Sequence, residues 1–146
     1  MRAKNISLIV FLVFTTPAFS QLKTIKLDNA EINYLDKGSG QAIVFVHGAM
    51  EDYRTWEHQM DSFSKKYRVI AYSRRLNWPN HNIKEIKNFS GRTEAKDLAE
   101  LIIKLNIQPV HLVGHSYGGL VSLFLALEQP QLVRSLTLSE AGMVNW

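Results

Sequence analysis

The sequence contains no cysteine. This absence excludes disulfide bonds, zinc sites with thiolate ligands and a cysteine nucleophile. It does not identify the redox compartment, because a chain without thiols is compatible with any of them. It also excludes a lipoprotein anchor, since that modification needs a cysteine directly after the signal sequence.

The chain also lacks a concentrated run of basic residues. Lysine and arginine total 17 against 13 acidic residues, giving a formal net charge of +4. Proteins that bind nucleic acids usually gather their basic residues into one patch or stripe, so we expect no nucleic-acid partner. An apolar fraction of 46% with 21% charged residues over 146 positions is typical of one globular domain.

The first twenty residues have the pattern of a secretory signal peptide. Arg2 and Lys4 precede an apolar run over residues 6–14, and small residues follow at Ala18 and Ser20. The apolar run is too short for a helix to cross a bilayer core of about 30 Å. We therefore expect cleavage after Ser20, a secreted or periplasmic location, and no membrane anchor on the mature chain. An uncleaved anchor and a misassigned start are the alternatives.

The rest of the chain alternates between strand and helix patterns. Residues 24–27 and 31–35 alternate apolar with polar side chains on either side of a short polar turn, which predicts an antiparallel hairpin. Short apolar runs predict buried strands at 42–46, 69–71, 110–113 and 136–138. Apolar residues at helical spacing predict helices over 51–67, 95–105 and 120–127. This order predicts an α/β fold: a mostly parallel sheet with helices on both faces and an N-terminal antiparallel hairpin.

Two details of this pattern concern the helices. Either Ser90 or Thr93 can cap the second helix, after a polar loop over 74–91 that contains Pro79. The third helix is apolar on almost all sides, so we expect it to be buried in the middle of a domain. This helix and the last strand need packing partners beyond those that the 146 residues supply.

A Gly-x-Ser-x-Gly run lies between the strand at 110–113 and the third helix. In this context the run over Gly114, Ser116 and Gly118 predicts a nucleophile elbow, in which a sharp turn projects the serine hydroxyl above the sheet. The glycines are required because side chains there would collide with the neighbouring strand and helix. The N-terminus of the helix directs partial positive charge towards a developing oxyanion. The alternative is a glycine-rich turn whose serine only caps the helix.

With this elbow, the apolar strand that ends in His47 and Gly48, and Trp56 in the first helix, the chain resembles the α/β-hydrolase fold family. The resemblance covers residues 21–146 and corresponds to the N-terminal part of that fold, which implies truncation at the C-terminus. It implies that the backbone N–H groups of Ala49 and Tyr117 form an oxyanion hole. We interpret His47 as a buried, hydrogen-bonded support for this loop.

Two departures from the family pattern carry information. Many members have Asp-x-Arg-Gly-x-Gly after the second buried strand, whereas this chain has no glycine over residues 73–80. Arg74 and Arg75 in this segment could hold an anionic substrate, but we favour a solvated loop that pairs with local acids. Relatives that open epoxides or displace halide use an aspartate nucleophile, so Ser116 implies acyl transfer.

A base for Ser116 is missing from the expected place. In this family the chain order is serine, then acid, then histidine, yet every histidine here precedes Ser116: His47, His58, His81, His111 and His115. His115 is adjacent to the serine, but neighbours on a tight elbow point apart. We therefore expect the catalytic histidine beyond Trp146. Glu140 is a candidate for the acid, with a rim carboxylate as the default interpretation.

These features predict a hydrolase that cleaves an ester of a small-molecule substrate through an acyl-enzyme on Ser116. An amide or thioester substrate is a secondary alternative, and no metal or organic cofactor is implied. A serine-type haloperoxidase or perhydrolase relative would share the same elbow. A binding domain that has lost its base is the alternative from a different class of function. The substrate and the oligomeric state stay open.

Overall fold

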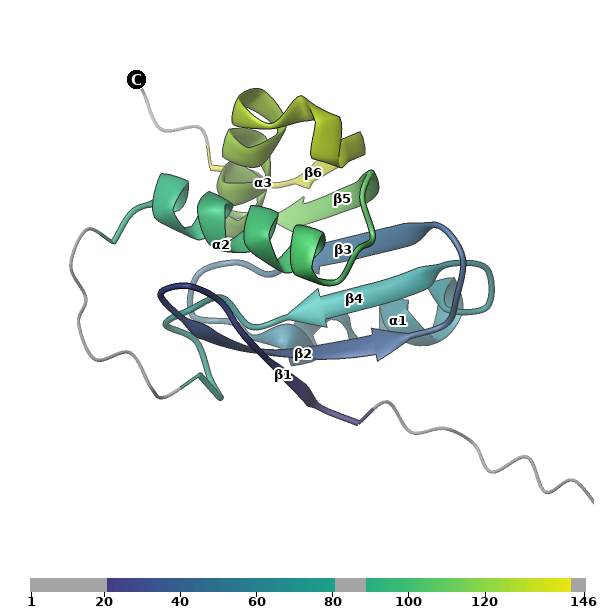
Figure 1. The fold of residues 1–146 in the computed structure, drawn as a ribbon. Helices are drawn as coiled ribbons and strands as arrows, with labels where there is room; N and C mark the ends of the chain where they lie inside the picture. Colours follow the sequence, from purple (N-terminus) through teal and green to yellow (C-terminus); the bar gives the residue numbers. More distant parts are fainter. Residues whose placement is uncertain (1–20, 81–88, 143–146) are drawn as a thin grey trace, which may run out of the picture.

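A computed structural model describes residues 21–80 and 89–142. The predicted signal peptide, residues 1–20, lies outside the described residues. Within them the chain forms one six-stranded sheet (Figure 1) with the order β1-β2-β4-β3-β5-β6. In chain order the strands are β1 (Lys23–Lys26), β2 (Glu31–Lys37), β3 (Ala42–Val46), β4 (Arg68–Tyr72), β5 (Val110–His115) and β6 (Val133–Ser139).

The N-terminal hairpin is confirmed. Strands β1 and β2 pair antiparallel with Ile25 opposite Ile32, and the Leu27 N–H closes the turn on the Ala30 carbonyl at 2.8 Å. Strand β2 then pairs antiparallel with β4. The hairpin therefore extends one edge of the sheet.

The other four strands are parallel, as their apolar runs predict. Strand β3 lies between β4 and β5, and Val44 is in register with Ile70 on one side and Leu112 on the other. Every residue of β3 is buried. Strand β6 pairs with β5 on one side only and lies at the edge of the sheet, where Leu138 is exposed.

Helices cover both faces of the sheet (Figure 1). Helices α2 (Gly91–Lys104) and α3 (Tyr117–Glu128) pack on one face, while a 3₁₀ turn, η1 (Tyr53–Trp56), and α1 (Glu57–Phe63) pack on the other. A second 3₁₀ turn, η2 (Pro130–Leu132), connects α3 to β6. The two apolar cores are separate, because side chains alternate between the faces of a strand.

The first helix is shorter than the sequence predicts, and the third has an uncovered face, in line with its expected need for further packing partners. Helix α1 ends at Phe63 instead of near Tyr67. A turn follows, in which the Lys66 N–H bonds the Phe63 carbonyl, and the Arg68 N–H already bonds the Gln41 carbonyl where β4 begins. Helix α3 is buried on one face only, and Leu127 is 67% exposed. Within the described residues nothing covers this outer face.

The start of α2 resolves the capping alternatives in favour of Ser90. Its hydroxyl accepts a hydrogen bond from the Thr93 N–H at 3.2 Å, which satisfies one N–H group of the first helical turn. No helix within the described residues is long and apolar enough to cross a membrane.

Adjacent isoleucines on α2 test the packing of this face. Ile102 is fully buried, whereas Ile103 is 49% exposed. We expect Ile102→Ala to lower the free energy of unfolding by about 2–5 kcal/mol, because it leaves a cavity. Ile103→Ala is the matched control and changes it by less than about 0.5 kcal/mol. Urea unfolding of the purified protein measures both, and equal losses would contradict this packing.

Candidate active site

The segments that follow β3, β4 and β5 meet at one edge of the sheet. These strands are parallel, so their carboxyl ends lie together, as in other open α/β sheets where ligands bind at this edge. The three segments begin with His47, Ser73 and Ser116. Ser116, both arginines and both proposed oxyanion donors belong to these segments, whereas Gly114 lies within β5 and Glu140 follows β6.

Ser116 lies between β5 and α3 with a backbone conformation that is rare for a serine. Its φ is 50° and its ψ is −121°, in a region that L-residues seldom occupy. The Ser116 N–H donates to the Ser139 carbonyl at 2.9 Å, and the Ser116 carbonyl accepts from the Gly119 N–H at 2.9 Å. The side chain accepts no hydrogen bond from the first turn of α3, which argues against the capping alternative.

The elbow depends on close backbone approach at two glycines. A Cβ at Gly118 would overlap the carbonyl oxygens of Val46 and His47 at the end of β3. A Cβ at Gly114 would lie 2.7 Å from the Gly118 carbonyl oxygen and 2.8 Å from the Ser122 hydroxyl. The first turn of α3 is thus packed directly against the end of β3.

The two residues that the family resemblance assigns to an oxyanion hole lie on either side of this contact. Ala49 is an exposed residue directly after Gly48, and Tyr117 is the first residue of α3. The first N–H groups of a helix have no partner inside the helix. No hydrogen bond between described residues uses the N–H of Ala49 or of Tyr117.

His47 is fully buried and hydrogen-bonded through both ring nitrogens. Its Nδ1 lies 2.8 Å from the Gly48 carbonyl, and its Nε2 lies 2.9 Å from the Arg74 N–H. These partners require a proton on Nδ1 and a lone pair on Nε2, which is the neutral ring. Burial and the nearby Arg74 guanidinium lower the pKa of His47 to about 4.

Arg74 and Arg75 do not lie in a solvated loop, so that part of the sequence interpretation is wrong. Arg74 is 3% exposed and pairs with Glu94 at 2.6 Å. Arg75 is also buried, and its Nε donates to Asp97 at 2.6 Å. The expected pairing with acids is correct. Both acids face the loop because they lie three residues apart on α2.

Sequence reasoning missed Glu51 in the loop after β3. One carboxylate oxygen accepts the Gly48 N–H at 2.8 Å, and the other lies 3.3 Å from Nδ1 of His115. Burial opposes ionisation of this carboxyl, but the bonds from Gly48 and His115 hold the pKa of Glu51 below its usual value. No motif marks this residue. The available signal is its position shortly after a buried strand, at the first residue of the predicted helix.

Glu140 and His115 lie near each other at this edge. Nε2 of His115 is 3.8 Å from a carboxylate oxygen of Glu140, whose side chain is 86% exposed. No hydrogen bond between described residues joins His115 to the Ser116 hydroxyl. In the described part of the chain, no three His, Asp or Glu side chains are grouped to hold a metal ion.

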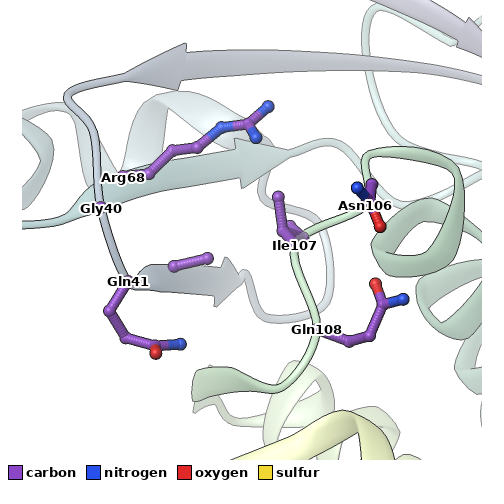
Figure 2. Close-up of a pocket in the computed structure, with 7 residues that line it drawn as sticks. Gly40, Gln41, Arg68, Asn106, Ile107 and Gln108 are labelled. Atoms are coloured by element: carbon purple, nitrogen blue, oxygen red, sulfur yellow. The ribbon is translucent and has the colours of Figure 1, made fainter.

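A hollow of about 300 Å³ lies at the opposite end of the strands (Figure 2). It is lined by Gly40 and Gln41 before β3, Arg68 at the start of β4, and the segment 106–108 before β5. It is therefore separated from Ser116 by the length of the strands, and it is not part of the candidate site.

Comparison with known proteins identifies the family of the chain. The family model described as alpha/beta hydrolase fold matches residues 41–146. The chain belongs to the alpha/beta hydrolase fold family.

Three relatives illustrate the breadth of that family. The (E)-2-((N-methylformamido)methylene)succinate hydrolase of Acinetobacter baylyi is 30% identical over 119 residues, which cover 78% of this chain and 43% of the relative. The soluble epoxide hydrolase of a Corynebacterium species is 28% identical over 110 residues, covering 75% and 38%. The solved structure of Est816, an N-acyl homoserine lactone degrading enzyme, has a TM-score of 0.77 at 26% identity, covering 82% and 46%. The chain thus spans less than half the length of these proteins.

The close approach at Gly118 generates a stability prediction. We expect Gly118→Ala to lower the free energy of unfolding by about 3 kcal/mol or more, because the backbone carbonyls of β3 cannot move aside. Gly142→Ala is the control, since a Cβ there has no atom within 4 Å. Thermal and urea unfolding measure both variants, and a Gly118→Ala protein of wild-type stability would refute the close contact.

The buried neutral His47 generates a pH prediction. Because its folded pKa of about 4 lies below the usual value of 6.5, the unfolded state binds more protons between these values, and stability falls as the pH falls through that window. From pH 6.5 to 4, we expect wild type to lose about 3 kcal/mol more than His47→Gln. Urea unfolding across this range measures the difference, and parallel curves would contradict it.

Proposed function

We propose that the protein is a serine hydrolase that cleaves an ester of a small-molecule substrate through an acyl-enzyme on Ser116. The observation that carries the proposal is the backbone of Ser116, held at φ 50° and ψ −121° at the N-terminus of α3. The strained backbone is explained if the serine hydroxyl must project away from the helix in order to react. A serine that only capped the helix would not need it.

The relatives support hydrolysis as the reaction class. Two of the three proteins compared above are named as hydrolases, and the third is described as degrading a lactone, which is a cyclic ester. The epoxide hydrolase shares the fold but catalyses ring opening. A serine at position 116 favours acyl transfer, because its hydroxyl can form an ester with the substrate's acyl group.

The proposed reaction has two halves. The Ser116 oxygen attacks the ester carbonyl carbon while a base takes the serine proton, and the carbonyl oxygen becomes an oxyanion bonded by the N–H groups of Ala49 and Tyr117. Collapse of this intermediate breaks the bond to the alcohol, which leaves with the proton. Water then attacks the acyl-enzyme in the same manner and releases the acid.

The base is proposed to lie in a longer protein, after Trp146. His47 is unsuited because both its ring nitrogens are occupied and its pKa is about 4. His115 contacts Glu51 and Glu140 instead of the serine. His111 bonds the Ser135 hydroxyl of the neighbouring strand β6 at 2.7 Å. The acid partner of the base is also open, with Glu140 as one candidate at this edge.

Fluorophosphonate labelling of the full-length protein tests the proposal. We expect one modification, on Ser116, because the activated oxygen attacks phosphorus and fluoride leaves. Ser116→Ala should abolish labelling and p-nitrophenyl acetate hydrolysis. Ser139→Ala, which removes an exposed hydroxyl beside the elbow, should change neither by more than about twofold. Mass spectrometry of the labelled peptide and a chromogenic assay provide the measurements.

The outcomes separate the two classes of function. Labelling at Ser116 with ester turnover supports the hydrolase, whereas a folded full-length protein without labelling supports a binding domain that lacks a base. The 146-residue chain by itself should not turn over p-nitrophenyl acetate. Ser116-dependent turnover by that shorter chain would refute the placement of the base after Trp146.

A further inference from the structure

The Arg74 guanidinium uses all three of its nitrogen atoms at the candidate site. Nε donates to the His47 carbonyl at 3.1 Å, Nη2 donates to the Gly48 carbonyl at 2.8 Å, and Nη1 donates to Glu94 at 2.6 Å. Its central carbon lies 4.8 Å from the centre of the Tyr117 ring. One buried cation therefore contacts both segments that carry the proposed oxyanion donors.

The two carbonyls that Arg74 binds belong to consecutive peptide groups. The first peptide group joins His47 to Gly48, and its N–H is taken by Glu51 at 2.8 Å. The second joins Gly48 to Ala49. Its carbonyl also receives a bond from Nδ1 of His47 at 2.8 Å, while no hydrogen bond between described residues uses its N–H. Among the described residues, therefore, the N–H of the first group has a partner and the N–H of the second has none.

We propose that Arg74 is a positioning residue that fixes and polarises the Gly48–Ala49 peptide group for binding the oxyanion. The inference rests on the function proposed above. Because a trans peptide group is planar, holding its carbonyl from one side directs its N–H to the other. A charged donor on the carbonyl also strengthens the N–H as a donor through polarisation. Arg74 acts through Ala49 and does not touch the substrate.

Glu94 holds the guanidinium in this orientation. Its carboxylate is 1% exposed and lies on α2, which packs against α3. Burial raises the pKa of Glu94, and the adjacent Arg74 guanidinium opposes this effect. Arg74 thereby connects three segments that are distant in the sequence: the loop after β3, helix α2, and the first residue of α3.

The adjacent Arg75 provides a matched control. It is also buried and pairs with an acid of α2, Asp97, through Nε at 2.6 Å. No bond joins it to a backbone carbonyl of the candidate site within the described residues. Arg75→Lys should therefore disturb a buried ion pair of the same kind without altering the Gly48–Ala49 peptide group.

The test measures how fast an alkyl fluorophosphonate labels Ser116 in the full-length wild type and in Arg74→Lys, Glu94→Gln and Arg75→Lys. We expect Arg74→Lys to lower the second-order rate constant about 10- to 100-fold, somewhat less than the loss of a whole oxyanion donor. Glu94→Gln should lower it by about threefold or more. Arg75→Lys should stay within about twofold of wild type.

Two further readouts distinguish positioning from a purely structural role. Partial misfolding lowers the labelled fraction but leaves the rate constant of the folded fraction unchanged. With p-nitrophenyl acetate, loss of oxyanion binding should lower kcat while KM changes by less than about twofold. Arg74→Lys and Arg75→Lys with equal rate constants would overturn the proposal, even if both proteins are less stable. A wild type that is not labelled at Ser116 overturns the proposed function first, and this inference with it.

Discussion

The elbow at Ser116 joins the parallel sheet to α3, and its backbone conformation can persist only because the surrounding atoms hold it. A serine at φ 50° and ψ −121° costs about 1–3 kcal/mol of strain. The contacts that hold the strained backbone come from segments that are distant in the sequence. The Ser139 carbonyl accepts a hydrogen bond from the Ser116 N–H, and the end of β3 packs against Gly118. The strained turn is therefore a property of the whole sheet edge, and the candidate site exists only when β3, β5 and β6 are assembled.

Local sequence patterns predict the framework of this edge well. The hairpin and the buried strands follow from alternation and from continuous apolar runs, because those patterns reflect which faces of a strand are covered. The elbow follows from the spacing of Gly114, Ser116 and Gly118, because only glycines permit the approach that the structure shows at the two outer positions. In each case the information lies within a few consecutive residues.

Most of the features that sequence reasoning missed depend on contacts between distant residues. The partners of Arg74 and Arg75 lie about twenty residues further along the chain, and the polar segment 74–91 indicates a loop without indicating that its first residues are buried. Glu51 gives no periodic signal, because its significance comes from the Gly48 N–H and from His115. The Gly48 contact spans only three residues, but it lies in an irregular loop that no motif marks. The His115 contact could not be inferred until the strand order had placed β3 beside β5.

The Arg74–Glu94 pair is better explained by the direction of its bonds than by stability. A buried ion pair contributes little net stability compared with well-packed apolar side chains of similar volume, so such residues could hold α2 to the sheet equally well. Apolar side chains could not donate to the carbonyls of both His47 and Gly48. Lysine offers one charged nitrogen and cannot reproduce the planar fork. The feature that distinguishes arginine from these substitutes is therefore its planar set of N–H donors, and two of these donors bond the loop after β3.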